Sequence, residues 1–245
     1  MGVGRRKYLT DASGWRYGDE CTCTHPAVYE LMSDMKDIER FISGFKVFRE
    51  EYFGPRGSRF EALQHGQSPR TMIIGCSDSR VDPAILTNAA PGDLFTIRNV
   101  ANLVPPYEEN GCLHGVSAAL EFAVCNLEVE HIIVLGHSNC GGIGALMTGE
   151  CGTGGGGFIN RWMCIAAPAR ERVLAELPHK SPELQRQAVE EASILLSVEN
   201  LHSFPFIDRR VKEGKLSLHG WYFDLTQGEL LEYDAERGGF MRLGG

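Results

Sequence analysis

The sequence has no uninterrupted apolar stretch approaching the about 20 residues that a transmembrane helix needs. The segment Met1–Tyr17 is polar and lacks the apolar core of a secretory signal peptide, so we expect a cytoplasmic protein without a membrane partner. Positive charge is also scarce, because 24 Lys and Arg residues stand against 32 Asp and Glu residues, a net charge of −8. Proteins that bind nucleic acid carry clustered positive charge, so we expect no nucleic-acid partner either.

The eight cysteines include no Cys-x-x-Cys pair and have no regular spacing. Without a secretion signal we expect free thiols that pack in the core or bind a metal, and no disulfide framework. Cys21, Cys23 and His25 form a crowded cluster without a fourth ligand, which makes it a weak candidate for a second metal site. The glycine-rich run 152–157 fits a dinucleotide-binding pattern only formally, because a helical stretch precedes it, and we interpret it as a surface loop.

The chain does contain alternating strand and helix patterns. Apolar runs predict strands at residues 71–75, 94–98, 131–135, 216–225 and 230–233. Helical spacing predicts helices at 116–127, at 158–177 with a break at Pro168, and at 182–203. Such runs are typical of parallel strands covered by helices on both sides. We therefore expect an α/β fold: a parallel-centred β-sheet flanked by helices, with an N-terminal helical arm and a late helical segment.

The N-terminal part of the chain differs from the rest. Residues 1–30 carry no clear fold signal and are expected to form an extension, followed by a single domain over residues 31–245. A helix predicted from Ser33 to about Tyr52 has one apolar face. That face is formed by Ile38, Phe41, Ile42, Phe45 and Phe48. So many apolar side chains on a helix outside the sheet region suggest docking on another subunit, so we expect self-association as a dimer or a higher oligomer.

Chemically reactive side chains follow two of the predicted strands. Cys76, Asp78 and Arg80 come after the first strand, and His137 and Cys140 follow the third. The carboxyl ends of parallel strands meet at one edge of an open α/β sheet. Two thiolates and an imidazole are ligands that zinc prefers, and three ligands with a free fourth position mark a catalytic site. The alternative is that the cysteines are small buried core residues, and the spacing alone does not decide.

Taken together, Cys76-Ser-Asp78-Ser-Arg80 and His137-x-x-Cys140 closely resemble the motifs of the β-class carbonic anhydrases. The resemblance covers about residues 35–235 and leaves the first 30 residues unexplained. It extends to the segments Gly66–Pro69, Pro91–Phe95, Arg98–Asn102, Ser117–Glu121, Gly136–Ser138 and His219–Trp221. It implies a zinc lyase, a carbonate dehydratase that interconverts CO2 and bicarbonate.

The resemblance implies one Zn²⁺ per chain, bound by Cys76, His137 and Cys140 with water in the fourth position. The pKa of a water on catalytic zinc falls to about 7, and the resulting hydroxide would attack CO2. Asp78 is expected to be catalytic, because its carboxylate would accept a hydrogen bond from that hydroxide and orient it. Arg80 would pair with Asp78 and keep it ionised.

The resemblance also implies a substrate pocket. Gln67 would donate its amide N–H to a CO2 or bicarbonate oxygen, Phe95 and Val100 would form an apolar wall, and Gly141 completes the predicted set. Phe122 also belongs to it, at a position where the family often has a tyrosine, so a hydroxyl is missing here. Family pockets are usually built across a dimer interface, so Gln67 and Phe122 could serve the zinc of the partner.

Family members differ in whether the site closes at low pH. The closing type has a bicarbonate pocket made of Trp, Arg and Tyr, whereas the corresponding positions here are Ile73, Arg98 and Phe223. An anion there would be poorly paired, so we expect the open, non-switching type. Two alternatives stay open at this point: hydrolysis of carbonyl sulfide or carbon disulfide on the same scaffold, and a non-catalytic zinc protein.

Overall fold

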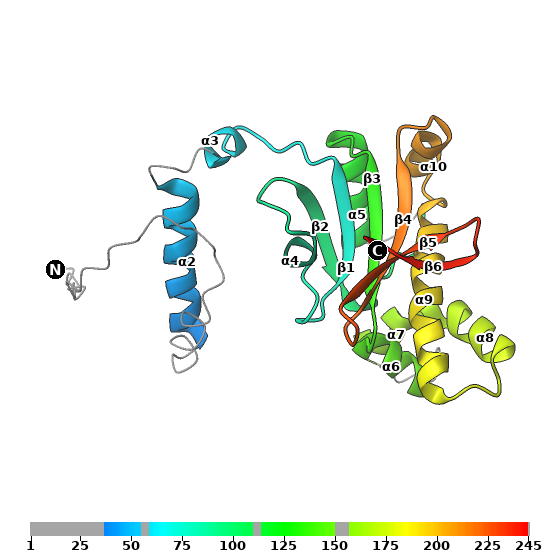
Figure 1. The fold of residues 1–245 in the computed structure, drawn as a ribbon. Coiled ribbons are helices and arrows are strands. Elements are labelled where there is room, and N and C mark those ends of the chain that lie inside the picture. The colour runs from blue at the N-terminus through cyan, green and yellow to red at the C-terminus, as the bar shows by residue number, and fades with distance from the viewer. Residues whose placement is uncertain (1–36, 55–58, 110–113, 150–156, 245) are drawn as a thin grey trace, which may run out of the picture. The chain divides into compact units, whose positions relative to one another are not determined.

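The computed structural model describes residues 37–54, 59–109, 114–149 and 157–244 (Figure 1). Cys21, Cys23, His25 and residues 152–156 lie outside the described residues, so the second metal site and the glycine-rich loop stay predictions. None of the described helices is long and apolar enough to cross a membrane.

The chain separates into two compact units, Met1–Gln64 and His65–Gly245. The division predicted from the sequence, an extension followed by one domain, stays a prediction. In the first unit, helix α2 (Asp37–Phe53) confirms the predicted helix, and α3 (Arg59–Leu63) follows it. No residue of α2 is buried. Most of its predicted apolar face lacks a cover in the described part of the chain, because Ile38 is 68%, Phe41 60% and Phe45 61% exposed. Phe48 is the exception and packs against Phe60 of α3, with ring centroids 5.7 Å apart.

The second unit contains a six-stranded sheet with the strand order β2-β1-β3-β4-β5-β6. The strands are β1 (Thr71–Cys76), β2 (Leu94–Asn99), β3 (His131–His137), β4 (Ser217–Asp224), β5 (Glu229–Asp234) and β6 (Gly239–Arg242). The first four strands pair in parallel, and β5 and β6 pair antiparallel at one edge. This confirms the predicted α/β class and five of its strands; the sequence did not indicate β6, which is too short to show an alternating pattern.

The helices of this unit are α4 (Pro83–Thr87), α5 (Gly115–Glu121), α6 (Gly141–Thr148), α7 (Phe158–Met163), α8 (Ala167–Glu176), α9 (Pro182–Leu201) and α10 (Pro205–Lys212). The predicted helix over 158–177 is divided into α7 and α8 by a 3-10 turn at Cys164–Ala166. The break lies just before Pro168, which stands in the first turn of α8. Proline fits this position, because the backbone N–H that it lacks would have no partner within the helix. The sequence did not indicate α10.

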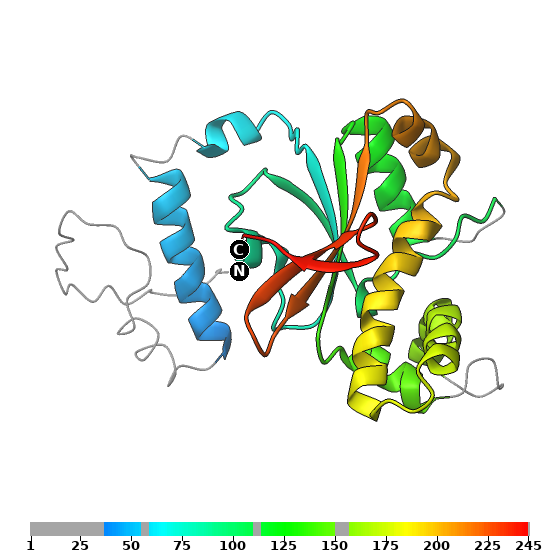
Figure 2. The same cartoon turned by 45° about the vertical axis from the view of Figure 1, so that its right-hand side comes forward.

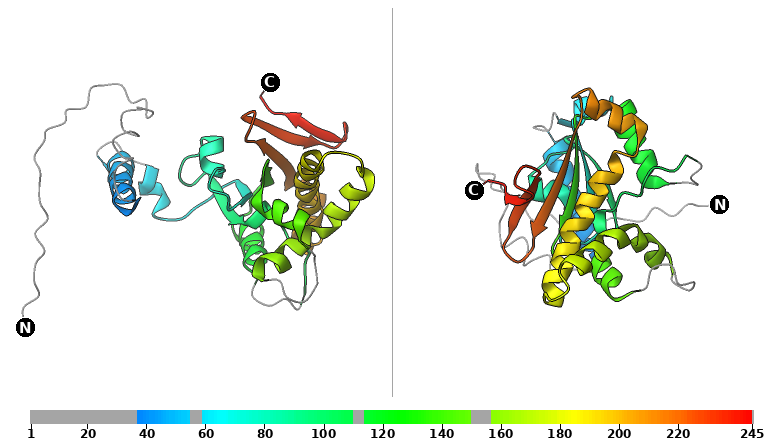
Figure 3. Two further views of the ribbon diagram at one scale, coloured as in Figure 1. Left: turned by 90° about the horizontal axis from the view of Figure 1, so that it is seen from below. Right: turned by 90° about the vertical axis from the view of Figure 1, so that its right-hand side faces the viewer.

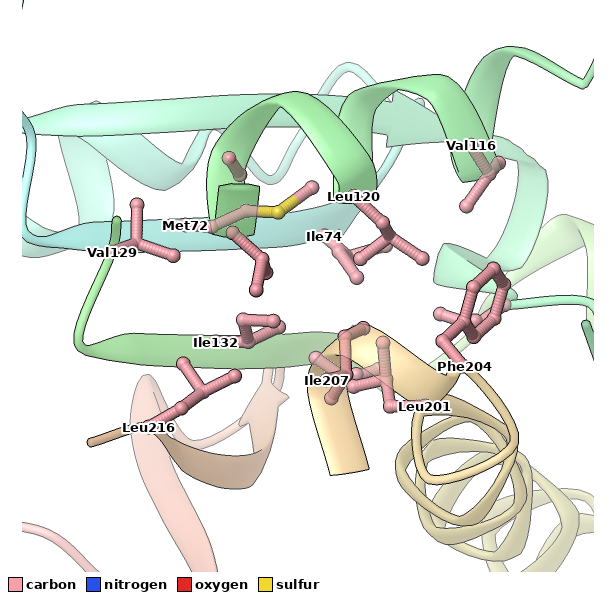
Figure 4. Packing of buried hydrophobic residues seen from close by; sticks show 14 of the residues in the cluster. Met72, Ile74, Val116, Leu120, Val129, Ile132, Leu201, Phe204, Ile207 and Leu216 are labelled. Carbon is pink, nitrogen blue, oxygen red and sulfur yellow. The ribbon is translucent and has the colours of Figure 1, made fainter. Parts of the chain in front are cut away.

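Three helices cover one face of the sheet and enclose the main core (Figure 4). Alternate strand residues point to this face, as the period of two in a strand requires. The cluster joins Met72, Ile74 and Ile132 of the sheet to Val116 and Leu120 of α5, Leu201 of α9 and Ile207 of α10. Figure 2 shows α9 running along the sheet, where it contacts both β3 and β4. Figure 3 shows α8 beside α9.

Helix α9 packs unusually closely on β3 and β4. A Cβ atom added to Gly136 of β3 would lie 2.6 Å from the Cδ1 atom of Ile194 on α9, and one added to Gly220 of β4 would lie 3.0 Å from its Cγ2 atom. Ile194 is fully buried, so a larger side chain at either position would have to displace it. The two glycines therefore allow Ile194 of α9 to lie directly against these strands.

Candidate metal centre

Three potential metal ligands meet at the carboxyl edge of the sheet. Cys76 is the last residue of β1 and His137 is the last residue of β3, which pairs with β1 in parallel. Cys140 immediately precedes α6. The three residues are buried, and their donor atoms lie within 4.8 Å of one another. The structure thus brings together the three residues that the sequence pattern indicated as ligands.

The ring of His137 is oriented for a metal ligand. Its Nδ1 atom lies 2.9 Å from the carbonyl oxygen of Ser138. A carbonyl only accepts hydrogen bonds, so Nδ1 carries the proton and Nε2 keeps its lone pair. The Nε2 atom is buried and has no hydrogen-bond partner among the described residues. A buried polar atom without a partner is unfavourable, and a cation at this point would remove the deficit.

The Cys76 and Cys140 sulfurs lie close enough to change each other's pKa. The pKa of Cys76 is lowered, mainly because the Cys140 thiol donates a hydrogen bond to its sulfur, with further N–H donation from the backbone. The Asp78 amide nitrogen lies 3.4 Å from that sulfur. The same interaction, together with burial, raises the pKa of Cys140. A metal binds both sulfurs as thiolates, so its binding would release the thiol protons.

A salt bridge lies beside the three ligand residues. Arg80 donates to both carboxylate oxygens of Asp78, from Nε to Oδ1 at 2.9 Å and from Nη2 to Oδ2 at 2.7 Å. These bonds hold the pKa of Asp78 well below its usual range. Oδ2 of Asp78 also lies 3.9 Å from Nε2 of His137. The carboxylate is therefore ionised, fixed in direction and adjacent to the ligand group.

Arg98 on β2 holds the loop that follows Cys76. Its guanidinium donates to the carbonyl oxygens of Cys76 at 2.9 Å, Asp78 at 2.7 Å and Val81 at 2.9 Å, and to the carboxylate of Asp82 at 3.0 Å. Arg98 stands at the position of the arginine in the bicarbonate pocket of the closing type, a pocket that we do not expect to form here. In the structure four of its five N–H groups donate to the loop that follows Cys76.

The turn between the second and third ligands is strained. Asn139 has a φ of 57°, in the left-handed region that non-glycine residues rarely adopt. Its carbonyl oxygen accepts a hydrogen bond from Arg80 Nη2 at 3.1 Å. The next amide, that of Cys140, donates to the buried carboxylate of Glu190 on α9 at 2.9 Å. Arg80 thus contacts both the loop of the first ligand and the turn of the other two.

The contact of Glu190 with Cys140 was not predicted from the sequence. In sequence Glu190 is one of two adjacent glutamates in a helix with many charges, which suggests a solvent-exposed position. A signal was nevertheless present, because Glu190 falls in register with Ile194, Ser197 and Leu201, the buried side of α9. Charged residues on the apolar side of a helix usually have a partner.

The predicted substrate residues are only partly brought together. The rings of Phe95 and Phe122 lie 5.8 Å apart, and Phe122 is 43% exposed. Val100 is 37% exposed, and its carbonyl oxygen accepts a hydrogen bond from the Trp162 indole at 2.7 Å. Gly141 is the first residue of α6, next to Cys140. Gln67 is exposed, and no contact among the described residues joins it to the three ligand residues.

The comparisons with known proteins agree with this geometry. Residues 71–230 match the family model described as carbonic anhydrase. The chain is 40% identical over 198 residues to a carbonic anhydrase of Synechocystis sp., an alignment that covers 80% of this chain and 71% of the relative. The solved structure of the β-carbonic anhydrase CcaA has a TM-score of 0.77 and 36% identity, with 85% of this chain and 100% of that chain covered.

A tetrameric β-carbonic anhydrase from Sordaria macrospora has a TM-score of 0.66 and 29% identity, with 86% of this chain and 98% of that chain covered. The family match and the relatives all span the segments that carry Cys76, His137 and Cys140. This chain therefore belongs to the β-class carbonic anhydrases, lyases that use zinc to convert CO2 and bicarbonate into one another.

Proposed function

We propose that this chain catalyses the reversible hydration of CO2 to bicarbonate and a proton, with one Zn²⁺ held by Cys76, His137 and Cys140. The observation that carries the assignment is the buried Nε2 atom of His137, which has no partner among the described residues and belongs to a group with two sulfurs. Two thiolates and one imidazole fit zinc, and three protein ligands leave a position for a reacting molecule.

A zinc ion bound there would supply a Lewis acid that lowers the pKa of a water to about 7. Asp78 is the group of this chain beside that position, because its Oδ2 atom lies 3.9 Å from Nε2 of His137. Its two bonds from Arg80 keep it ionised, so it can only accept a hydrogen bond. Asp78 therefore takes a hydrogen bond from the reacting water and turns the lone pair of that water toward the carbon of CO2.

We propose that apolar side chains form the substrate side of the site. Phe95 and Phe122 pack against each other, and the exposed parts of Phe122 and Val100 offer a surface suited to a nonpolar gas. Gly141 leaves room beside this wall, because no atom lies within 4 Å of the position of an added Cβ. We place Gln67 at the substrate through a second copy of the chain, where its amide N–H would donate to a substrate oxygen.

The two alternative functions, a structural zinc site and hydrolysis of carbonyl sulfide or carbon disulfide, are less well supported. A purely structural zinc site has no use for a carboxylate fixed beside its fourth position, as Asp78 is fixed by Arg80. No feature of the described residues around the ligand group favours carbonyl sulfide or carbon disulfide over CO2. Rates on CO2 and on carbonyl sulfide, measured side by side on one preparation, separate these substrates.

We also propose that the site stays open, with Asp78 bound to Arg80 and away from the zinc. Arg98 is engaged by the loop after Cys76, and Ile73, at the position of the tryptophan in the closing type, is fully buried and offers no donor. Phe223 has no hydroxyl. Four of the five N–H groups of Arg98 are bonded to that loop, so a bicarbonate ion at these residues would be poorly paired.

Self-association is the third part of the proposal. The apolar face of α2 is exposed in the described chain, and large exposed apolar faces mark interaction sites. The relative from Sordaria macrospora is described as tetrameric. We infer that α2 packs on a second copy of this chain and that the substrate pocket is completed in the same assembly.

The ligand assignment predicts the behaviour of Cys140→Ser. A serine hydroxyl does not ionise near neutral pH as a thiol does, so the variant should lose both zinc and CO2 hydration. Zinc content and stopped-flow hydration are measured on the same sample, with Cys164→Ser as the control outside the ligand group. A Cys140→Ser protein with the wild-type zinc content and the wild-type hydration rate would show that Cys140 is not a ligand.

The orienting role predicts that Asp78→Asn keeps zinc but loses kcat by a factor on the order of 10² or more, as for other positioned hydrogen-bonding groups. Asn has nearly the same shape but cannot accept as an anion. Asp208→Asn, on the surface at α10, is the control. Unchanged turnover of Asp78→Asn between about pH 7 and 9 would rule out the role.

The open site predicts a gradual pH profile. The pKa of Asp78 is lowered by Arg80, so the pair is complete above the ordinary carboxyl value of about 3.9 and is lost only below it. Asp78 therefore does not titrate in the working range, and kcat should fall smoothly below about pH 7, following one proton. A steep, cooperative loss near about pH 8 would contradict the proposal.

The assembly predicts a mass in solution that is a multiple of 27.0 kDa, measured by light scattering at micromolar concentration. Phe45→Asp, on the apolar face of α2, should lower that mass, because it would bury a charge in the interface. Lys46→Glu, at an exposed neighbouring position, should not. A wild-type mass of 27.0 kDa would contradict self-association.

A further inference from the structure

A buried carboxylate lies behind the third ligand residue. Glu190 of α9 is only 3% exposed, and its Oε1 atom accepts the hydrogen bond of the Cys140 amide at 2.9 Å. Its Oε2 atom accepts a hydrogen bond from the hydroxyl of Tyr222 at 3.0 Å, and Tyr222 is 2% exposed. Both carboxylate oxygens therefore have a fixed donor, one on the ligand turn and one on β4.

A second residue of α9 holds the same turn. Arg186 lies one helical turn before Glu190, and its Nη2 atom donates to the side-chain oxygen of Asn139. Its Nε atom lies 3.8 Å from Oε1 of Glu190. Asn139 is the residue in the left-handed region, so its conformation needs outside support. The helix thus binds two successive residues of the turn, Asn139 and Cys140.

The position of α9 itself is tightly determined. Ile194, one turn after Glu190, lies against Gly136 and Gly220 without room for a side chain at either glycine. Gly136 directly precedes the ligand His137. Burying a carboxylate costs free energy unless it is well paired, and an apolar side chain would pack at this position at lower cost. Packing does not require a glutamate at this position. Its hydrogen bonds to the Cys140 amide and the Tyr222 hydroxyl explain its presence.

We propose that Glu190, supported by Arg186 and Tyr222, is a positioning residue that sets the direction of the Cys140 sulfur toward the metal. The amide of Cys140 precedes α6 and has no acceptor within that helix, as is general for the first N–H groups of a helix. Glu190 supplies the acceptor and ties the peptide plane to α9. This inference rests on the proposed zinc ligands; Glu190 touches neither substrate nor metal.

The test compares Glu190→Leu with Glu190→Gln and with the control Glu191→Leu. Leu removes the acceptor, and Gln keeps an oxygen that can accept the Cys140 N–H. The neighbouring Glu191 is half-buried and bonds only to Gln187 in the described hydrogen-bond pattern. Zinc affinity is measured on each folded protein by competition with a chromophoric chelator, alongside its melting temperature without metal.

Loss of a group that orients a metal ligand typically costs 10- to 100-fold in metal affinity. Glu190→Leu should show a loss of about this size, while Glu190→Gln and Glu191→Leu keep the wild-type zinc affinity. A purely structural role would lower the melting temperature without changing the zinc affinity of the folded protein. Wild-type affinity in Glu190→Leu, or an equal loss in Glu190→Gln, would overturn the proposal.

A second variant keeps the test decisive if Glu190→Leu does not fold. Arg186→Met changes a side chain that is 38% exposed, so folding should be retained. With Co²⁺ in place of zinc, the thiolate-to-metal charge-transfer band of Arg186→Met should shift relative to wild type, because the Asn139–Cys140 turn loses a contact. An unchanged band would overturn the proposal. A wild-type protein that binds no metal would instead refute the proposed function.

Discussion

The parallel pairing of β1 with β3 is the constraint on which the metal centre depends. Because the two strands are adjacent and run in the same direction, their last residues, Cys76 and His137, leave the sheet at the same edge. Cys140 then needs only a short turn to join them. A displacement of one residue in this register would point one ligand to the opposite face of the sheet. The two strands that carry these residues are central in the sheet, and their apolar side chains are buried.

Backbone strain is concentrated around this edge. Ala101, Asn102 and Asn139 have positive φ values of 62°, 48° and 57°. Each such residue costs of the order of 1–3 kcal/mol and persists only where its surroundings hold it. Arg80 binds the carbonyl oxygen of Asn139. The side chain of Asn99 spans Ala101 and Asn102, because it bonds to both the N–H and the carbonyl oxygen of Leu103. Side-chain hydrogen bonds thus support these turns.

Much of the fold and the three ligand residues could be predicted from the sequence, because these features depend on local patterns. The five longer strands show as apolar runs, and the ligands follow two of them directly. The missed features depend on tertiary contacts. Strand β6 exists only through its pairing with β5, and α10 is defined by burial of Ile207 in the main core. Glu190 has a partner 50 residues away, so its spacing on α9 indicates burial but does not identify that partner.

The backbone also affects how strongly the sulfurs donate to a metal. Two thiolates reduce the effective charge of zinc, which opposes activation of a water. The Cys76 sulfur, however, receives a backbone N–H, because the amide nitrogen of Asp78 lies 3.4 Å from it. Such bonds withdraw electron density from sulfur and leave the metal more acidic. The loop that places Cys76 thus partly offsets the cost of using two thiolates.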